Sequence, residues 1–256
     1  MIHLTNAVCW TLLLATVGNA QNASLKMRFA IDGPAPRPKQ INVGPAFPRL
    51  AVPLVNERLI VDQQSKGIQN VVVHVYTGRR GTKLAQVPNK GTERVLTMAN
   101  GRFDPRVLIA QSGDTLKVID NGPVQHSAII HFFTNQPQVL TPKPNQPARI
   151  PLPNAEPGPI PIECNIHPWM RSYIVVLDHP YVAVSDASGN LSIQGLPENQ
   201  TVHFQVWHEA SAGLFKQVMI KDTIVDWPRG RFEVDLVAGL NDIGDILIPA
   251  ATLKND

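Results

Sequence analysis

The chain has 256 residues, of which 43% are hydrophobic and only 17% are charged, and its formal net charge is +3. This weak charge, and the lack of a Lys/Arg block with interleaved aromatic residues, argue against nucleic-acid binding. The length allows one large domain or two small ones. The 23 prolines and 17 glycines, scattered between short apolar runs, predict many short strands rather than helices.

Residues 1–20 differ from the rest of the chain. The stretch from Ala7 to Val17 is mostly apolar, and small residues follow at 17–20, as at a signal-peptide cleavage site. The segment is too short to span a membrane stably, although His3 stands where a Lys or Arg is usual. We therefore expect a secretory signal peptide and a periplasmic or otherwise exported mature protein without a membrane span.

Export would change the cysteine count. Cys9 would leave with the signal peptide, so that Cys164 remains alone and no disulfide can form within the monomer. A lone cysteine in an oxidising compartment is either an inert buried side chain or a ligand. His167 and Met170 stand close to Cys164 in the sequence, and they favour the ligand interpretation.

The first part of the chain contains apolar runs separated by turn-rich segments. The stretch 25–31 is strand-like, whereas the proline-rich run 34–38 cannot pair as a central strand and indicates a surface connection. Further apolar runs occur at 58–61 and 71–76. The polar stretch 78–92 marks a candidate domain boundary.

Beyond residue 92 the turn signals become regular. Strands are expected at 95–98, 106–110, 115–119, 125–133, 160–162, 173–177, 181–184, 191–193, 202–207, 215–220, 232–236 and 244–248, with an edge strand at 148–152. No segment has the 3.6-residue period of a helix over a helical length. The predicted fold class is therefore all-β.

One loop between two expected strands carries three candidate metal ligands. Cys164, His167 and Met170 follow a C-x2-H-x2-M spacing, so a single loop can bring all three to one ion. A thiolate, an imidazole and a thioether suit copper that cycles between Cu(I) and Cu(II). His126 is the best candidate for a fourth ligand, because it follows the turn at 121–123 and opens a strand.

Four motifs in order carry a family resemblance. They are Phe103-Asp104-Pro105, Gly113-Asp114-Thr115-Leu116, Val124-Gln125-His126-Ser127 and Cys164-Asn165-Ile166-His167-Pro168-Trp169-Met170. Together they resemble a cupredoxin of the amicyanin or plastocyanin type over roughly residues 92–178, which implies a Greek-key β-sandwich with one type 1 copper. The resemblance implies that His126, Cys164 and His167 are equatorial ligands and that Met170 is a weak axial one. A CuA site would need a second cysteine in this loop, and a copper nitrite reductase would need a second copper site.

The resemblance also suggests supporting roles. Asp120 or Asn121 is expected to hydrogen-bond the Cys164 sulfur or to tie the two ligand loops together. Simple turn chemistry is an equally good reason for both residues. Pro168 and Trp169, beside His167, are expected to form an apolar docking patch for a partner.

The flanks resemble another fold. Residues 62–76 and 186–197 look like two halves of a carboxypeptidase-regulatory, transthyretin-like β-sandwich, and the whole chain resembles exported bacterial proteins labelled methylamine-utilisation proteins. The expected division is a signal peptide at 1–20, one part of a β-sandwich at 21–91, a cupredoxin domain at 92–178 and the other part of the sandwich at 179–256. The pattern leaves open whether 21–91 pairs with the C-terminal strands.

Two functions remain open. One is an exported one-electron carrier, not an enzyme, whose partner is a redox protein such as a c-type cytochrome or a dehydrogenase. The other is an exported protein that binds copper for a structural or partner-binding purpose without electron transfer. No G-x-S-x-G, H-E-x-x-H or phosphate-binding glycine loop occurs. A second metal site at His203, His208 and Glu209 is disfavoured, because strand alternation separates the two histidines.

Overall fold

The computed structural model describes residues 22–44, 47, 50, 53–143, 145–211 and 215–254. The predicted signal peptide and Cys9 lie outside these residues. The described chain is built from strands, with short 3-10 turns at Glu209–Ser211 (η1), Pro228–Gly230 (η2) and Ala250–Thr252 (η3), which confirms the all-β prediction. None of these helical turns in the described ranges is long and apolar enough to cross a membrane.

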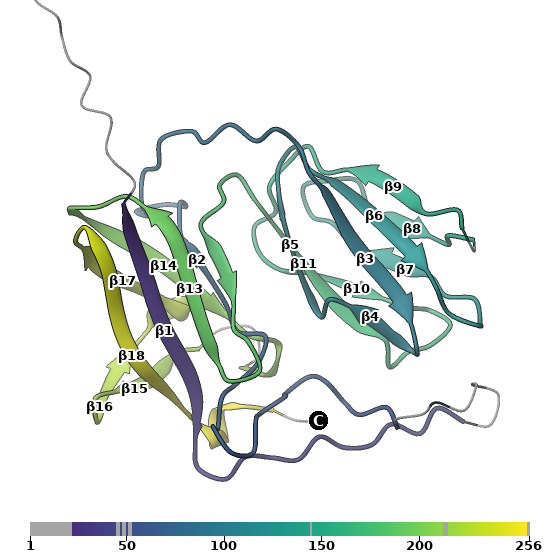
Figure 1. Ribbon diagram of the computed structural model, residues 1–256, viewed down its shortest axis with the longest axis horizontal. Coiled ribbons are helices and arrows are strands. Elements are labelled where there is room, and N and C mark those ends of the chain that lie inside the picture. Colours follow the sequence, from purple (N-terminus) through teal and green to yellow (C-terminus); the bar gives the residue numbers. More distant parts are fainter. Residues whose placement is uncertain are drawn as a thin grey trace, which may run out of the picture.

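The first β-sandwich, which we call the flanking sandwich, combines strands from both ends of the chain (Figure 1). Its sheets have the orders β13-β1-β18-β15-β16 and β12-β2-β14-β17. The strands are β1 (Ala23–Asp32), β2 (Val72–Val75), β12 (Val182–Val184), β13 (Asn190–Leu196), β14 (Gln200–Trp207), β15 (Gln217–Ile220), β16 (Thr223–Asp226), β17 (Arg231–Leu236) and β18 (Gly239–Pro249). β1 pairs parallel with β18 and antiparallel with β13, so the N-terminal segment does pair with the C-terminal strands.

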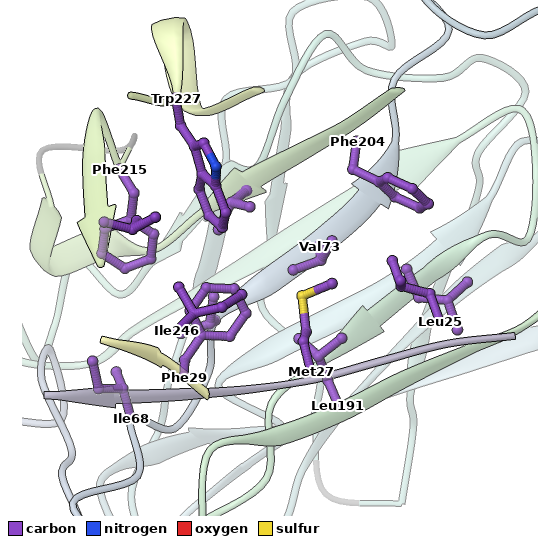
Figure 2. Close-up of a cluster of buried hydrophobic side chains, with 14 of the residues drawn as sticks. Leu25, Met27, Phe29, Ile68, Val73, Leu191, Phe204, Phe215, Trp227 and Ile246 are labelled. Carbon is purple, nitrogen blue, oxygen red and sulfur yellow. The ribbon is translucent and has the colours of Figure 1, made fainter. Parts of the chain in front are cut away.

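Alternation along β1 builds the core of this sandwich. Leu25, Met27 and Phe29 point inward and are 0–1% exposed. Figure 2 shows these side chains directed toward residues of the opposite sheet, and Phe29 stacks on Phe215 with ring centroids 6.1 Å apart. Burying a side chain of this size contributes about 1.5–3 kcal/mol each. The period-2 pattern of the sequence thus fixes which face of β1 is buried.

The second β-sandwich, which we call the central sandwich, lies between the two halves of the first in sequence. Its sheets have the orders β5-β11-β10-β7-β8 and β4-β3-β6-β9. The strands are β3 (Glu93–Ala99), β4 (Arg102–Asp104), β5 (Val107–Gln111), β6 (Thr115–Asp120), β7 (Ala128–Ile130), β8 (Gln138–Leu140), β9 (Ala148–Pro151), β10 (Ile160–Glu163) and β11 (Arg171–Leu177). β9 is an edge strand, as its proline predicts. Cys164 and Met170 belong to the core of this sandwich.

The two sandwiches pack against each other along β11. Ile174 and Val176 enter the central core, while Val175 and Leu177 on the other face join an apolar cluster with Val72 of β2. This double burial explains why residues 173–177 read as an unbroken apolar run rather than an alternating one. The run 58–61, in contrast, does not become a strand and forms an isolated bridge, between Val61 and Ile68.

The segment that joins β1 to β2 leaves the flanking sandwich and runs alongside the central one (Figure 1). Two apolar side chains of this segment, Phe47 and Leu54, are 8% and 4% exposed. Both approach Gly101, where an added Cβ would lie 2.7 Å from a Leu54 methyl carbon and 3.0 Å from the Phe47 ring. Gly101, with φ +70°, therefore gives the segment room to lie close to the β3–β4 turn.

Candidate metal centre

The pairing of β10 with β11 closes the loop that carries three of the predicted ligands. Glu163 lies opposite Arg171 in the ladder, and the Cys164 N–H donates to the Met170 carbonyl over 3.3 Å. Inside the loop, the Met170 N–H donates to the His167 carbonyl over 2.9 Å. These short-range bonds hold the Cys164, His167 and Met170 side chains at the same end of the sandwich.

Cys164 is buried, with 3% of its surface exposed, and it is a free thiol. Two backbone N–H groups point at its sulfur, from His167 at 3.4 Å and from Ser127 at 3.5 Å. The sulfur lies 3.9 Å from Nδ1 of His167. Such donors would share the negative charge of a metal-bound thiolate and fix its direction.

His126 is fully buried and held by Asp120. The Asp120 carboxylate accepts a hydrogen bond from the His126 backbone N–H at 3.1 Å and lies 2.9 Å from its Nδ1. An ionised carboxylate only accepts hydrogen bonds, so this contact engages Nδ1 as the donor and leaves Nε2 as the ring nitrogen that could offer a lone pair to a metal. Nε2 is buried and has no hydrogen-bond partner among the described residues. A buried, unpartnered ring nitrogen of this kind is available as a metal ligand.

The Asp120 contact differs from one of our expectations. Asp120 bonds His126 and the Gly122 N–H, not the Cys164 sulfur, and the Asn121 N–H donates to the Met98 carbonyl. The two ligand loops are tied instead by Ser127 and Asn165, because the Asn165 N–H donates to Ser127 Oγ over 3.3 Å. The sequence motifs assign no such role to Ser127 and Asn165, and the only signal for it is a short polar residue directly after each of His126 and Cys164. Gly122 is also required, because a Cβ there would lie 2.3 Å from Cε1 of His126.

His167 lies at the rim of the cluster and is 9% exposed. Its ring centroid is 4.9 Å from that of His126 and 5.1 Å from those of Phe47 and Trp169. Burial, and then the positive charge that His126 would carry, lower the pKa of His167, while Asp120 acts in the opposite direction. The lowered pKa favours the neutral imidazole, which is the form that binds metals.

Of the two predicted docking residues, only Pro168 is exposed to solvent. Pro168 is exposed, as is Ile166 at 47%, but Trp169 is half-buried and donates its indole N–H to the Gly101 carbonyl over 3.2 Å. Phe47 covers one side of both His167 and Trp169. No sequence pattern pointed to Phe47, because it reaches the centre from a segment that precedes the central sandwich.

Three of the predicted ligands lie together, since the His167 ring neighbours both the His126 ring and the Cys164 sulfur, and Met170 belongs to the same apolar core as Cys164. Met170 is 2% exposed and contributes a soft thioether from the core of the central sandwich. Within the described part of the chain, no three His, Cys, Asp or Glu side chains converge closely enough to hold a metal ion by themselves. The orphaned Nε2 of His126 and the soft donors around it nevertheless fit a copper ion, and their closure around the ion stays a prediction.

The alternative site at His203, His208 and Glu209 is not assembled. Both ring nitrogens of His208 are engaged, with the Gln69 carbonyl at 3.1 Å and the Ala210 N–H at 3.1 Å. The Glu209 carboxylate is paired with Arg106. His203 lies beside Glu233 instead, at 3.5 Å. The three side chains therefore have separate structural partners.

No family model and no curated protein matches this chain. Among solved structures, it is similar to a reduced single-residue variant of amicyanin, with 24% identity over 32% of this chain and 79% of that one, at a TM-score of 0.28. An oxidised amicyanin variant is 18% identical over 42% of this chain and 98% of that one, at a TM-score of 0.29. A copper-containing nitrite reductase from Thermus scotoductus is 21% identical over 40% of this chain and 25% of that one, also at 0.29. Likenesses this weak leave the function to be argued from the residues of the chain itself.

Proposed function

We propose that this protein is an exported one-electron carrier, not an enzyme, that holds a single type 1 copper with His126, Cys164, His167 and Met170. The observation that carries the proposal is the buried, unpartnered Nε2 of His126, whose ring neighbours that of His167, which in turn lies beside the buried Cys164 thiol. Bound copper would take up and release one electron by cycling between Cu(I) and Cu(II). Exclusion of water and the rigid strands on both sides would keep the ligands in place as the charge changes.

The solvent exposure of the ligands indicates where an electron would enter and leave. His167 is the ligand nearest to solvent, and Pro168 and Ile166 beside it are exposed and apolar. A small apolar patch suits the brief encounters of redox proteins, which bury little surface. We therefore propose that a redox partner, such as a c-type cytochrome or a dehydrogenase, docks over Ile166 and Pro168.

Copper titration tests the proposal. We expect the purified protein to bind one Cu(II) with an intense thiolate-to-copper absorption band, and Cys164→Ser to lose that band while its far-UV circular dichroism stays unchanged. His126→Gln should also lose the band, whereas His131→Gln, which changes an exposed histidine outside the cluster, should keep it. A wild-type protein that binds copper without the band, or a band that survives Cys164→Ser, would contradict the proposal.

Asp120 offers a second test. Replacing Asp120 by alanine removes the acceptor that orients His126, so we expect copper affinity to fall by about 10–100-fold. Competition with a chromophoric chelator measures this change. Asp32→Ala, which removes an exposed carboxylate from β1, is the control and should leave the affinity unchanged. An unchanged affinity in Asp120→Ala would mean that packing alone positions His126.

A second candidate, copper held for structure alone, is favoured by one observation. Phe47 packs edge-on to His167 and leaves that ligand only 9% exposed. Under this alternative, copper would raise the thermal stability but would exchange electrons slowly with small reductants and with cytochromes. Rapid and reversible bleaching of the absorption band by a mild reductant, and its return with oxidised cytochrome c, would exclude it.

A further inference from the structure

A hollow on the flanking sandwich gathers an unusual concentration of positive charge. It has a volume of about 390 Å³ and is separate from the copper ligands. Four of its six lining residues are arginines. The lining consists of Tyr76, Arg79, Arg80, His203, Arg229 and Arg231.

The sheet β12-β2-β14-β17 brings these residues together from distant parts of the chain. β14 lies between β2 and β17, and the Tyr76 N–H donates to the His203 carbonyl over 2.8 Å. Arg231 pairs with Gln205 of β14, two residues from His203, so both side chains lie on the same face. The loop after β2 supplies Arg79 and Arg80, and the 3-10 turn before β17 supplies Arg229.

The charge in the hollow is not neutralised from within. In the described ranges, none of the four arginines forms an ion pair with a carboxylate. The lining itself contains no carboxylate, and Glu233, which is 67% exposed, lies 3.5 Å from His203. The lining therefore carries four guanidinium groups and no carboxylate, in a chain whose total net charge is only +3.

The guanidinium group of Arg231 has a fixed position and an unpartnered nitrogen. Its guanidinium carbon lies 3.6 Å from the centroid of the Tyr76 ring, which fixes the direction of the group. Its Nε is buried and has no hydrogen-bond partner among the described residues. Arg80 and Arg229 adopt φ values of 63° and 59°, a left-handed conformation that is uncommon for residues other than glycine. Backbone strain of this kind concentrates at ligand sites.

We propose that this hollow binds a ligand that carries two or more phosphate groups. Guanidinium groups match phosphate oxygens with two parallel hydrogen bonds, and a single phosphate could not balance four of them. An adjoining hollow of about 610 Å³ shares His203 and Arg231, and its lining includes Trp227, Phe232 and Ile243. An apolar body attached to the phosphates would lie there. The source is either a free diphosphate compound or the head group of a lipid.

Calorimetric titration tests this site with sodium diphosphate as the probe. We expect saturable binding at about 20 mM salt that weakens at about 200 mM salt, because screening reduces the attraction. The double variant Arg79→Gln with Arg229→Gln should weaken binding by at least about tenfold, since each exposed arginine loses charge-assisted hydrogen bonds. The double variant Arg37→Gln with Lys39→Gln removes the same charge from an exposed segment elsewhere and should bind as the wild type does.

A second arm separates the two sources. A short-chain lipid diphosphate, used below its micelle concentration, should bind more tightly than diphosphate and change Trp227 fluorescence if the head group of a lipid is the source. Equal affinity without a fluorescence change indicates a free diphosphate compound. The proposal is overturned if neither probe binds, or if the arginine variant binds both probes as the wild type does.

Discussion

Replacing Asp114 by alanine is expected to lower the free energy of unfolding by about 3–5 kcal/mol. Asp114 is 1% exposed and ends the turn that begins at Gln111 and leads into β6. One carboxylate oxygen accepts from the Asn89 amide at 2.9 Å and the Thr92 N–H at 2.8 Å, and the other accepts from Arg94 at 2.7 Å and the Gln111 N–H at 2.9 Å. Alanine would leave these donors unpartnered, and it would loosen the segment 89–92 that leads into β3.

The same carboxylate predicts a pH dependence. Burial raises the pKa of Asp114, but the hydrogen bonds from Asn89, Gln111, Arg94 and Thr92 outweigh this effect and hold the pKa at about 2, below the ordinary 3.8. A lowered pKa means that the stabilisation is present above the ordinary value and is lost as the pH falls toward 2. The wild type should therefore lose stability from pH 4 to pH 2 more steeply than Asp114→Ala does.

Urea unfolding, followed by circular dichroism across this pH range, measures both effects. Asp32→Ala serves as the control, because Asp32 is exposed at the end of β1, and its effect should stay within about 0.5 kcal/mol. A difference between wild type and Asp114→Ala below about 1 kcal/mol at neutral pH would show that water replaces the lost acceptor.

Replacing Glu209 by alanine is expected to lower the free energy of unfolding by a similar amount, about 3–5 kcal/mol. It should also weaken the coupling between the unfolding of the two sandwiches. The Glu209 carboxylate binds Arg106 through two hydrogen bonds of 2.8 Å, and the two side chains are only 4% and 13% exposed. Without Glu209, the largely covered Arg106 guanidinium would remain beside the Arg171 carbonyl, with Glu57 4.0 Å away as its remaining carboxylate neighbour.

Differential scanning calorimetry measures this coupling. We expect one unfolding transition for the wild type and two separated transitions for Glu209→Ala, because the Arg106–Glu209 pair joins the start of β5 to the end of β14. Asp242→Ala breaks the exposed pair with Lys26 and should keep the single transition of the wild type, because solvent screens such surface pairs. A single unshifted transition in Glu209→Ala would mean that apolar packing around Val72 and Val175 suffices to couple the sandwiches.

Much of the candidate centre could be read from local spacing. The C-x2-H-x2-M pattern predicted that Cys164, His167 and Met170 share one loop, and the β10–β11 ladder with its internal hydrogen bonds holds them there. His126 could be proposed because a turn precedes it. Which ring nitrogen of His126 is free for a metal could not be predicted from the sequence, because it depends on which nitrogen the Asp120 carboxylate contacts.

The sequence by itself determined the all-β class, the inward faces of the strands and the ligand loop, because these depend on residues at most a few positions apart. Tertiary structure alone decided the rest. It paired β1 with β18 across more than 200 residues, placed Phe47 over His167, joined Arg106 to Glu209 and brought arginines from the loop after β2 close to arginines at β17. Such contacts depend on how the sheets pack against each other, and a local pattern of residues carries no information about that packing.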